Sequence, residues 1–314
     1  MAKIGFVFPG QGSQKQGMLA ELAAENPTLL DTFTRASEVL GKDLWRICQS
    51  DPDSSLDQTE ITQPVLLAAS VAVGTLWLER GGSRPAVMSG HSLGEYSALV
   101  LAGVLAFEDA IAVVHRRGKF MQDAVGPGEG KMAAIVGLDD NKLIEICARA
   151  ETIGTVSAAN FNSPGQIVIA GESAAVDYAV ERCKEAGAKR ALPLNVSVPS
   201  HCPLMKPAAE ALAEVLAAIT FSAPRIGVVQ NVSGAIQTEP EQIKENLVKQ
   251  LHKPVLWVDC VRAMHEVGVK KLVEIGPGRV LCGLVKRIVP ELGCMASENP
   301  QTFNNLVMEA SGLD

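Results

Sequence analysis

The sequence AVMSGHSLG at residues 86–94 places a GxSxG motif between a short apolar strand and the helical pattern of Glu95–Leu105. The glycines of the motif allow a turn too tight for a Cβ atom, so the hydroxyl of Ser92 projects above the edge of the sheet. The following helix directs its N-terminal N–H groups and positive dipole end at that hydroxyl. This context predicts a nucleophile elbow, in which Ser92 is the nucleophile and the backbone N–H of Leu93 binds an oxyanion. The alternative is a glycine-rich turn whose serine only caps the helix.

Strands and helices also alternate on the N-terminal side of this motif. Ile4–Phe8 is a short apolar run that ends at Pro9 and Gly10, a pattern typical of a buried strand. Helical patterns follow at Met18–Leu30 and Leu66–Leu78. This alternation predicts the α/β class, with a mostly parallel sheet covered by helices on both faces.

The middle of the chain has a different pattern, which begins at the glycine-rich cluster Gly126–Gly130. Its order is β-α-β-β-α-β, the arrangement of a split βαβ or ferredoxin-like unit. The expected strands are Met132–Leu138, Thr155–Asn160, Gln166–Ala170 and Lys189–Val196, and the expected helices are Asp139–Ala150 and Ser173–Ala186. We therefore predict a small subdomain at residues 127–198, inserted into a large α/β core of residues 1–126 and 199–314.

The α/β pattern resumes after this inserted unit. Short apolar runs predict strands, and longer periodic patterns predict helices. The expected strands are Ile226–Val232 and Lys271–Ile275, and the expected helices are Leu204–Ile219, Val255–Val267 and Val280–Ile288. The core sheet is thus expected to contain strands from both ends of the chain.

The composition of the chain argues against two classes of binding partner, nucleic acids and membranes. The 314 residues carry 28 basic and 35 acidic side chains, a formal net charge of −7, which argues against a general nucleic-acid binder. No stretch reaches the ~18 uninterrupted apolar residues of a membrane span, and the N-terminal residues lack the form of a secretory signal. We therefore expect no nucleic-acid or membrane partner.

The cysteines indicate a reducing compartment. Their number is odd, they are scattered, and no two form a CxxC pair. We expect reduced thiols in the core of a cytoplasmic protein. The seven are Cys48, Cys147, Cys183, Cys202, Cys260, Cys282 and Cys294.

A serine nucleophile needs a base, and His201 is the best candidate by position. It lies in the loop VPSHCP, residues 198–203, between the inserted unit and the returning helix. The alternative is a histidine on a surface loop. His91 lies inside the elbow and cannot easily fold back onto its neighbour, and His115 lies in a basic helix. His265 precedes Glu266 but is not part of an HExxH motif.

Two further segments offer groups for an anion. The loop PGQGSQ, residues 9–14, follows a strand, lacks the GxGxxG spacing of a dinucleotide site, and offers backbone N–H groups for a second half of an oxyanion hole. The basic run HRRGK, residues 115–119, is usually a solvated helix face. An anion site there requires Arg117 to point into the cleft, and Gly118 after it leaves room for a ligand.

Taken together, these motifs resemble the malonyl-CoA:acyl carrier protein transacylase family of fatty-acid synthesis. The resemblance extends from Lys3 to the last twenty residues, with no departure at a catalytic position. It rests on FPGQGSQ at 8–14, TQP at 62–64, GHSLGEYSAL at 90–99, RGKFMQ at 117–122, NSPGQIVIAG at 162–171, VPSHCPLM at 198–205 and EIGPG at 274–278. It implies a hydrolase-like core with a ferredoxin-like insert, in agreement with the pattern above.

The resemblance also implies roles for individual residues. Ser92 would form a malonyl ester, and His201 would act as its base and then as the acid for the leaving thiol. The family usually lacks an acidic third member, and its histidine is oriented instead by a backbone carbonyl, here that of Gln250. A fixed acceptor is sufficient to set the tautomer of an imidazole.

The resemblance also implies which groups contact the substrate. The backbone N–H groups of Gln11 and Leu93 would form the oxyanion hole. Arg117 would bind the free malonyl carboxylate through its planar fork of donors. Gln63 would help to shape the acyl pocket.

The activity implied is transfer of a malonyl group from malonyl-CoA to the phosphopantetheine thiol of acyl carrier protein, through a Ser92 ester and without a metal or other cofactor. One alternative is a stand-alone acyltransferase that serves a polyketide synthase. Another is a serine thioesterase or lipase-like hydrolase, although these enzymes normally place the histidine near the C-terminus. A carrier-docking scaffold without activity is disfavoured because Ser92, His201 and Arg117 are all present.

Acyl carrier proteins are typically acidic, whereas this chain has a net charge of −7. Docking must therefore use a local positive field. The candidates are Lys189 and Arg190 on the inserted unit, and Lys286 and Arg287 on the last core helix. Solvated surface charge is the alternative for each pair. We expect the chain to act as a monomer.

Overall fold

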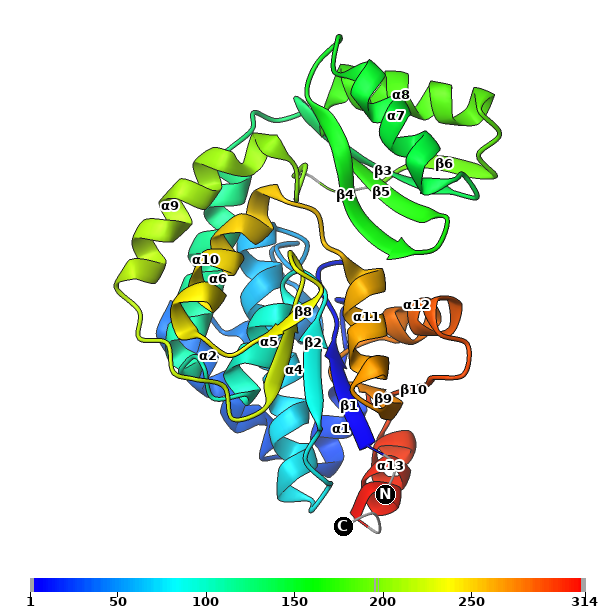
Figure 1. Ribbon diagram of the computed structural model, residues 1–314. Coiled ribbons are helices and arrows are strands. Elements are labelled where there is room, and N and C mark those ends of the chain that lie inside the picture. Colours follow the sequence, from blue (N-terminus) through cyan, green and yellow to red (C-terminus); the bar gives the residue numbers. More distant parts are fainter. Residues whose placement is uncertain (1–2, 195, 197, 312–314) are drawn as a thin grey trace.

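The computed structural model describes residues 3–194, 196 and 198–311. Its core is a six-stranded sheet, sheet A, with the order β10-β9-β1-β2-β7-β8 (Figure 1). Neighbouring strands are parallel except at the edge, where β8 is antiparallel to β7. The strands are β1 (Lys3–Phe8), β2 (Val87–Gly90), β7 (Gly227–Gln230), β8 (Ala235–Gln237), β9 (Val269–Glu274) and β10 (Gly293–Ala296).

Side-chain alternation along the strands explains why helices cover both faces of sheet A. In β1, Phe6 and Phe8 belong to the larger core cluster, whereas Val7 between them belongs to the cluster on the opposite face. Val228 and Val229 of β7 are divided in the same way. A strand that is apolar on both faces can be buried only between two helical layers.

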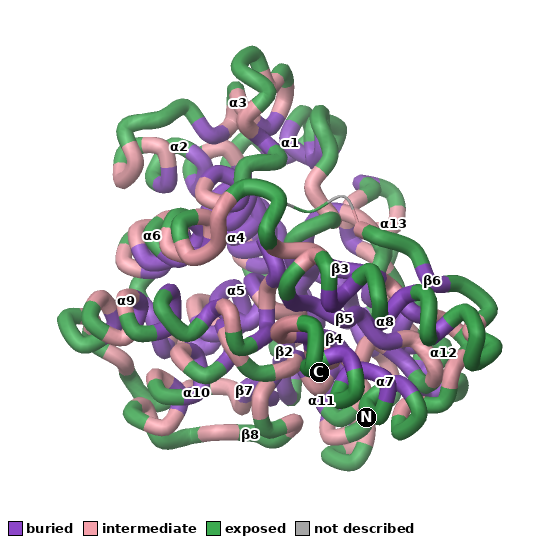
Figure 2. Tube along the Cα trace, turned by 90° about the horizontal axis from the view of Figure 1, so that it is seen from above, coloured by how far each residue is buried: buried purple, intermediate pink, exposed green. Residues whose placement is uncertain are grey.

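The two helical layers differ in size. One contains α2 (Leu29–Leu40), α4 (Thr59–Glu79), α5 (Gly94–Leu101), α6 (Phe107–Asp123), α9 (Lys206–Ala217) and α10 (Pro240–His252). The other contains α11 (Trp257–Glu266) and α12 (Val280–Ile288). Helix α4 is long and apolar enough to cross a membrane, but 89% of its most apolar window is buried inside the protein, and Figure 2 shows it among the other helices. It is therefore a core helix.

A second sheet, sheet B, has four antiparallel strands in the order β4-β5-β3-β6. Its elements are β3 (Gly130–Val136), α7 (Asp140–Ala150), β4 (Val156–Ser163), β5 (Gln166–Glu172), α8 (Ser173–Glu185) and β6 (Arg190–Pro193). Both helices pack on one face, and the unit lies above the core in Figure 1. This order confirms the predicted α/β fold with a ferredoxin-like unit. The domain boundaries at 126/127 and 198/199 stay a prediction.

The strand β4 connects the inserted unit to the core segment between α10 and α11. The N–H of Phe161 donates to the carbonyl of Val255, and the N–H of Val255 donates to the carbonyl of Ala159, both at 2.9 Å. The face of sheet B opposite its helices carries Met132 and Val168 toward the core. A cavity therefore forms between sheet B and the edge of sheet A.

The structure corrects the predicted helix at Met18–Leu30. Two helices are present instead, α1 (Ala20–Glu25) and α2, separated at Asn26 and Pro27. The proline ring disfavours a helical conformation at the preceding residue, which ends the first helix. The predicted helix Leu204–Ile219 begins as a short 3-10 helix, Pro203–Met205, and continues as α9. Several elements had no predicted counterpart: α3 (Leu44–Ser50), β8, α10, β10 and α13 (Pro300–Ser311). Asn195, in the predicted strand Lys189–Val196, lies outside the described residues.

The expectation of seven reduced cysteines is wrong for one pair. Cys282 and Cys294 form a disulfide, with a Cα–Cα distance of 5.0 Å. The parallel pairing of β10 with β9 places Cys294 beside the start of α12, where Cys282 lies. The other five cysteines are buried free thiols.

Candidate active site

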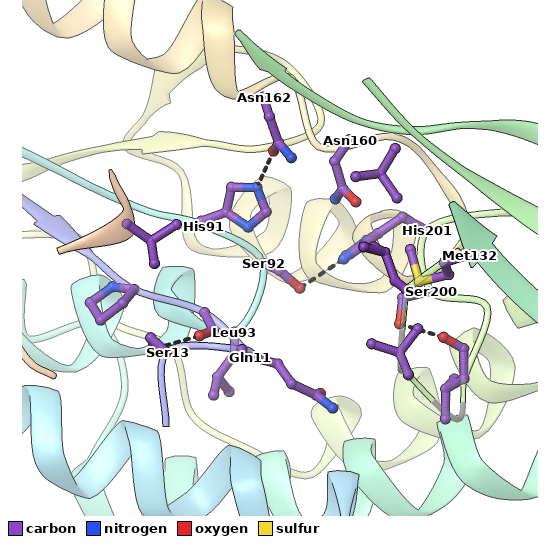
Figure 3. A pocket seen from close by; sticks show the side chains of 18 of the residues that line it. Gln11, Ser13, His91, Ser92, Leu93, Met132, Asn160, Asn162, Ser200 and His201 are labelled. Carbon is purple, nitrogen blue, oxygen red and sulfur yellow. Dashed lines mark hydrogen bonds between the residues drawn. The ribbon is translucent and has the colours of Figure 1, made fainter. Parts of the chain in front are cut away.

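The cavity between the sheets has a volume of about 260 Å³ (Figure 3). The parallel strands β1 and β2 end at this cavity, so the loops after them line it. Gln11 comes from the loop after β1, Ser92 from the loop after β2, and His201 from the segment after sheet B. Residues from three separate parts of the chain thus meet in one place.

Ser92 lies on a sharp turn between β2 and α5. Its φ is 51°, in the left-handed region that non-glycine residues rarely adopt. A Cβ on Gly90 would lie 1.9 Å from the carbonyl carbon of Gly94, and a Cβ on Gly94 would lie 2.2 Å from the carbonyl oxygen of Phe8. Both glycines are therefore required by close backbone approach, as the GxSxG motif predicted.

Asn231, immediately after β7, stabilises this turn through two side-chain hydrogen bonds. Its side-chain Oδ1 accepts from the N–H of Ser92 at 2.7 Å, and its Nδ2 donates to the carbonyl of Gly90 at 2.7 Å. Asn231 is fully buried, so these bonds are shielded from water. Asn231 was not recognised from the sequence, because no local pattern marks an asparagine that lies 139 residues from its partner.

His201 meets the serine directly. Its Nε2 lies 2.7 Å from Oγ of Ser92 (Figure 3). Its Nδ1 lies 2.7 Å from the backbone carbonyl of Gln250. A carbonyl oxygen only accepts, so Nδ1 bears the hydrogen and Nε2 presents its lone pair to the serine hydroxyl. His201 is 3% exposed and is therefore not a surface-loop histidine.

The electrostatic environment keeps His201 neutral. Burial and, secondarily, the positive charge of Arg117 lower the pKa of His201 to about 3. The charged imidazolium is disfavoured because it would lose its hydration and face a second cation. At neutral pH the imidazole is thus available as a base.

Arg117, on α6, lies beside the same hydroxyl. Its guanidinium is 1% exposed, and one terminal nitrogen is 3.4 Å from Oγ of Ser92. The side-chain oxygens of Gln63 and Gln250 accept from it at 2.8 and 3.0 Å, and the ring of Tyr96 lies 5.6 Å from its central carbon. All of these neighbours are neutral. The Nε–H has no acceptor among residues 3–194, 196 and 198–311.

The structure corrects the expected role of Gly118. A Cβ there would lie 2.6 Å from the Cα of Glu60 and 2.6 Å from the carbonyl oxygen of Thr59. Gly118 therefore makes room for the backbone of α4 rather than for a ligand. The resulting contact between α4 and α6 brings Gln63 close enough to bind Arg117. Gln63 itself is fully buried and contacts Arg117 and Met121 rather than lining the cavity.

Gln11 and Leu93 both line the cavity next to Ser92. Within the described part of the chain, neither backbone N–H donates to a protein acceptor. The two loops are in close contact, since a Cβ on Gly10 would lie 2.5 Å from the carbonyl oxygen of His91. Both N–H groups are thus free to bind an oxygen atom.

Two further polar groups lie next to the elbow, and of these only His91 was considered from the sequence. His91 points away from Ser92, and its Nε2 lies 2.8 Å from Oδ1 of Asn162 on β4, which ties the elbow to sheet B (Figure 3). Glu95 is 1% exposed, and burial raises its pKa to about 7. The remaining histidine candidates lie elsewhere: His115 contacts the carbonyl of Glu60, and His265 lies near Glu291.

A serine on a nucleophile elbow, hydrogen-bonded to a buried neutral histidine and next to a buried arginine, defines an α/β protein equipped for acyl transfer through serine. The family model described as an acyl transferase domain matches residues 5–299. The chain belongs to this family, and within it to the malonyl-CoA:acyl carrier protein transacylases.

Individual relatives are similar over nearly their full length. The malonyl CoA-acyl carrier protein transacylase of Escherichia coli K12 is 55% identical over 303 residues, which cover 96% of this chain and 98% of the relative. A crystal structure of an acyl carrier protein S-malonyltransferase from Vibrio cholerae matches with a TM-score of 0.95 and 54% identity, covering 97% of this chain and 100% of that one. A malonyl-transacylase in complex with its type II polyketide synthase acyl carrier protein matches with a TM-score of 0.97 and 52% identity. The match covers 98% of this chain and 100% of that one.

Proposed function

We propose that this protein transfers the malonyl group of malonyl-CoA to the phosphopantetheine thiol of acyl carrier protein, and so supplies fatty-acid chain elongation. One observation carries the choice of substrate: a buried arginine with only neutral partners lies 3.4 Å from the serine nucleophile. A buried cation without a carboxylate partner favours an acyl group that brings its own carboxylate. The activity named for the relatives supports the same substrate.

In the first half-reaction, Oγ of Ser92 attacks the thioester carbonyl while Nε2 of His201 takes its proton. The N–H groups of Gln11 and Leu93 stabilise the oxyanion of the tetrahedral intermediate. The C–S bond then breaks, the imidazolium gives its proton to the coenzyme A sulfur, and the malonyl ester of Ser92 remains.

In the second half-reaction, the phosphopantetheine thiol attacks the ester carbonyl and His201 takes the thiol proton. The C–O bond breaks, and the proton returns to Oγ of Ser92. Each half-reaction exchanges a thioester with an ester, so no metal or redox cofactor is required. The backbone carbonyl of Gln250 keeps the imidazole in the tautomer that both steps need.

Throughout both steps Arg117 binds the free malonyl carboxylate. Its guanidinium is adjacent to Oγ of Ser92, which is where the carboxylate of a short dicarboxylic acyl group would lie. Gln63 and Gln250 fix the plane of the guanidinium, and the Nε–H retains donor capacity. Both oxygens of a carboxylate suit such a planar fork.

We propose that acyl carrier protein docks on a patch formed by Lys189, Arg190, Lys286 and Arg287. Arg190 and Gln166 both pair with Val136 across sheet B, and a terminal nitrogen of Arg287 donates to the side-chain oxygen of Gln166. The two arginines therefore converge on one end of sheet B. All four cations are exposed, and none forms an ion pair within the described residues.

The patch lies beside the cavity, because Val280, Leu281 and Leu284 of the same helix α12 line the cavity wall. A carrier protein held there would present its phosphopantetheine arm at the cavity. A polyketide carrier is the second candidate, favoured by the similar transacylase that was solved with such a partner. The subdomain at residues 127–198, the monomeric state and the cytoplasmic location belong to the same proposal.

Intact-protein mass spectrometry after incubation with malonyl-CoA tests the mechanism. The expected result is an adduct of one malonyl group, which disappears when acyl carrier protein is added and reappears on the carrier. Release of free malonate without an adduct would indicate a hydrolase instead. An unchanged protein mass together with intact malonyl-CoA would indicate a scaffold.

A further inference from the structure

Glu95, in the first turn of α5, is a buried carboxylate that the proposed reaction does not use. Its Oε1 accepts from the side chain of Gln230 at 3.0 Å. Its Oε2 accepts from the backbone N–H of Asn231 at 2.8 Å and from Nε2 of Gln250 at 3.1 Å. A 1% exposed carboxylate therefore has both oxygens occupied by neutral donors.

The contact with Gln250 helps to determine which end of that amide faces Arg117. Nε2 of Gln250 donates to Glu95 and also to the carbonyl of Ser92 at 3.0 Å and to Oδ1 of Asn231 at 3.3 Å, and Glu95 is the one charged acceptor of the three. An ionised carboxylate only accepts, so the NH₂ end of Gln250 must face Glu95. Its oxygen then faces the guanidinium, where it accepts at 3.0 Å. In the reversed orientation the NH₂ group would meet the guanidinium donors, and Glu95 would lose a donor.

The same arrangement separates two opposite charges by one amide. Direct contact between Glu95 and Arg117 would neutralise the guanidinium and compete with a substrate carboxylate. With Gln250 between them, no carboxylate contacts Arg117 among residues 3–194, 196 and 198–311. Burial lowers the pKa of Arg117, and the nearby negative charge of Glu95 opposes this shift.

We propose that Glu95 is a positioning residue for acyl selectivity: it orients the Gln250 amide, which holds Arg117 in place without neutralising it. The inference rests on the proposed function, specifically on recognition of the malonyl carboxylate by Arg117. The backbone carbonyl of Gln250 that orients His201 is independent of this amide. Glu95 should therefore influence malonyl transfer more than transfer of an acyl group without a carboxylate.

The test compares kcat/KM for malonyl-CoA and acetyl-CoA at pH 8, above the Glu95 pKa of about 7. Glu95→Gln keeps the side-chain volume and removes the charged acceptor. We expect the malonyl-to-acetyl ratio to fall about 10- to 100-fold, the usual effect of losing a hydrogen bond to a buried charge. Equal losses for both substrates would overturn the proposal, because they would place Glu95 in support of the fold or of Ser92.

Gln230→Met is the matched control. It removes the donor on the other oxygen of Glu95 and leaves Gln250 untouched. We expect an unchanged malonyl-to-acetyl ratio, even if the thermal unfolding midpoint falls. A ratio that falls as far as in Glu95→Gln would also contradict the proposal.

Gln250→Met keeps the test decisive if Glu95→Gln fails to fold. This change preserves the backbone carbonyl for His201 and removes the amide link, together with the donor to the carbonyl of Ser92. It should lower the ratio about as much as Glu95→Gln, and the double variant should show little further loss, since both changes break one chain of contacts. Unchanged selectivity in Gln250→Met, or fully additive losses in the double variant, would refute the link.

The double variant Glu95→Gln with Gln250→Glu distinguishes the effect of orienting the Gln250 amide from the effect of a negative charge near Arg117. It retains one buried carboxylate but places it directly against Arg117. We expect malonyl selectivity to be lost in this variant, whereas retained selectivity would mean that a nearby negative charge suffices. Arg117→Ala tests the proposed function on which this inference rests. If the malonyl-to-acetyl ratio is unchanged in Arg117→Ala, Arg117 does not bind the malonyl carboxylate. If the ratio falls in Arg117→Ala but not in Glu95→Gln, only the role of Glu95 is refuted.

Discussion

Ser92 and His201 both adopt left-handed backbone conformations, with φ of 51° and 62°, and their side chains meet at 2.7 Å between Oγ and Nε2. Each such conformation costs about 1–3 kcal/mol. Two contacts from distant elements hold them: the N–H of Ser92 donates to Asn231, and the N–H of His201 donates to the carbonyl of Leu251 at 3.0 Å. The hydrogen bond between nucleophile and base is therefore built on strained backbone at both ends.

Ser92→Ala should abolish the malonyl adduct without unfolding the protein. Alanine meets the same backbone strain as serine, so the unfolding midpoint should change little. The rate of malonyl transfer should fall on the order of 10⁴–10⁶-fold, as for other serine nucleophiles. His201→Ala should cost a similar factor, and the double variant should be no worse, because the two residues act as one unit. Uptake of radiolabelled malonyl groups by Ser92→Ala would exclude Ser92 as nucleophile.

The lowered pKa of His201 should make folding stability sensitive to acid. Burial lowers the pKa from 6.5 to about 3, so between these values the unfolded chain binds a proton that the folded protein does not. Stability from this group is present above pH 6.5 and is lost as the pH falls toward 3, with a slope of up to about 1.4 kcal/mol per pH unit.

Chemical denaturation of the wild type and of His201→Gln from pH 4 to pH 7 checks this slope. Glu95, whose pKa is raised to about 7, contributes a slope of opposite sign to both proteins and cancels in the difference. The wild type should lose more stability than His201→Gln as the pH falls. Parallel pH curves for the two proteins would mean that the folded-state pKa of His201 is near its ordinary value.

Gly118→Ala should destabilise the protein and weaken malonyl transfer together. The new methyl group would press on the backbone of α4, and such overpacking typically costs about 1–3 kcal/mol. The displaced α6 would move Arg117 away from Gln63. Gly283→Ala is the control: it lies in a helix with open space around its Cβ, and should be neutral or stabilise by up to about 1 kcal/mol. Thermal unfolding and kcat/KM for malonyl-CoA are the measurements, and wild-type values for Gly118→Ala would contradict the packing argument.

Local sequence was sufficient to predict features that are determined locally. The nucleophile elbow follows from glycine spacing around Ser92, and the β-α-β-β-α-β order follows from hydrophobic periodicity. His201 was chosen because it lies in a loop between two predicted units. Its burial and its hydrogen bond to Ser92, 109 residues away, appear only in the folded chain.

Features that depend on tertiary packing were missed or misread. Asn231 and Glu95 act through partners more than a hundred residues away, so no periodicity marks them. Gly118 was assigned to a ligand because the helix that fills its space is distant in sequence. The Cys282–Cys294 disulfide escaped notice because its partners are brought together by strand pairing rather than by a short motif.

Arg117→Ala should reverse the acyl preference. Removing one partner of a buried charge pair typically costs about 3–5 kcal/mol, which corresponds to roughly 10²–10⁴-fold in kcat/KM for malonyl-CoA. Acetyl-CoA should be affected little, because an acetyl group leaves the guanidinium unpaired in the wild type. Arg117→Lys should also be poor, since one ammonium group cannot replace the separate donors to Gln63 and Gln250. An unchanged malonyl-to-acetyl ratio in Arg117→Ala would mean that another cation binds the malonyl carboxylate.

Charge reversal in the proposed docking patch should affect only the second half-reaction. Lys286→Glu with Arg287→Glu, or Lys189→Glu with Arg190→Glu, should raise KM for acyl carrier protein several-fold, because a positive field there speeds encounter with an acidic partner. The effect should shrink at high salt, and the rate of adduct formation from malonyl-CoA should be unchanged. Lys270→Glu is the control, since this exposed lysine lies near the start of β9, at the opposite end of sheet A from the site. Equal damage to both half-reactions would mean that these residues support the fold or the shared site rather than carrier docking.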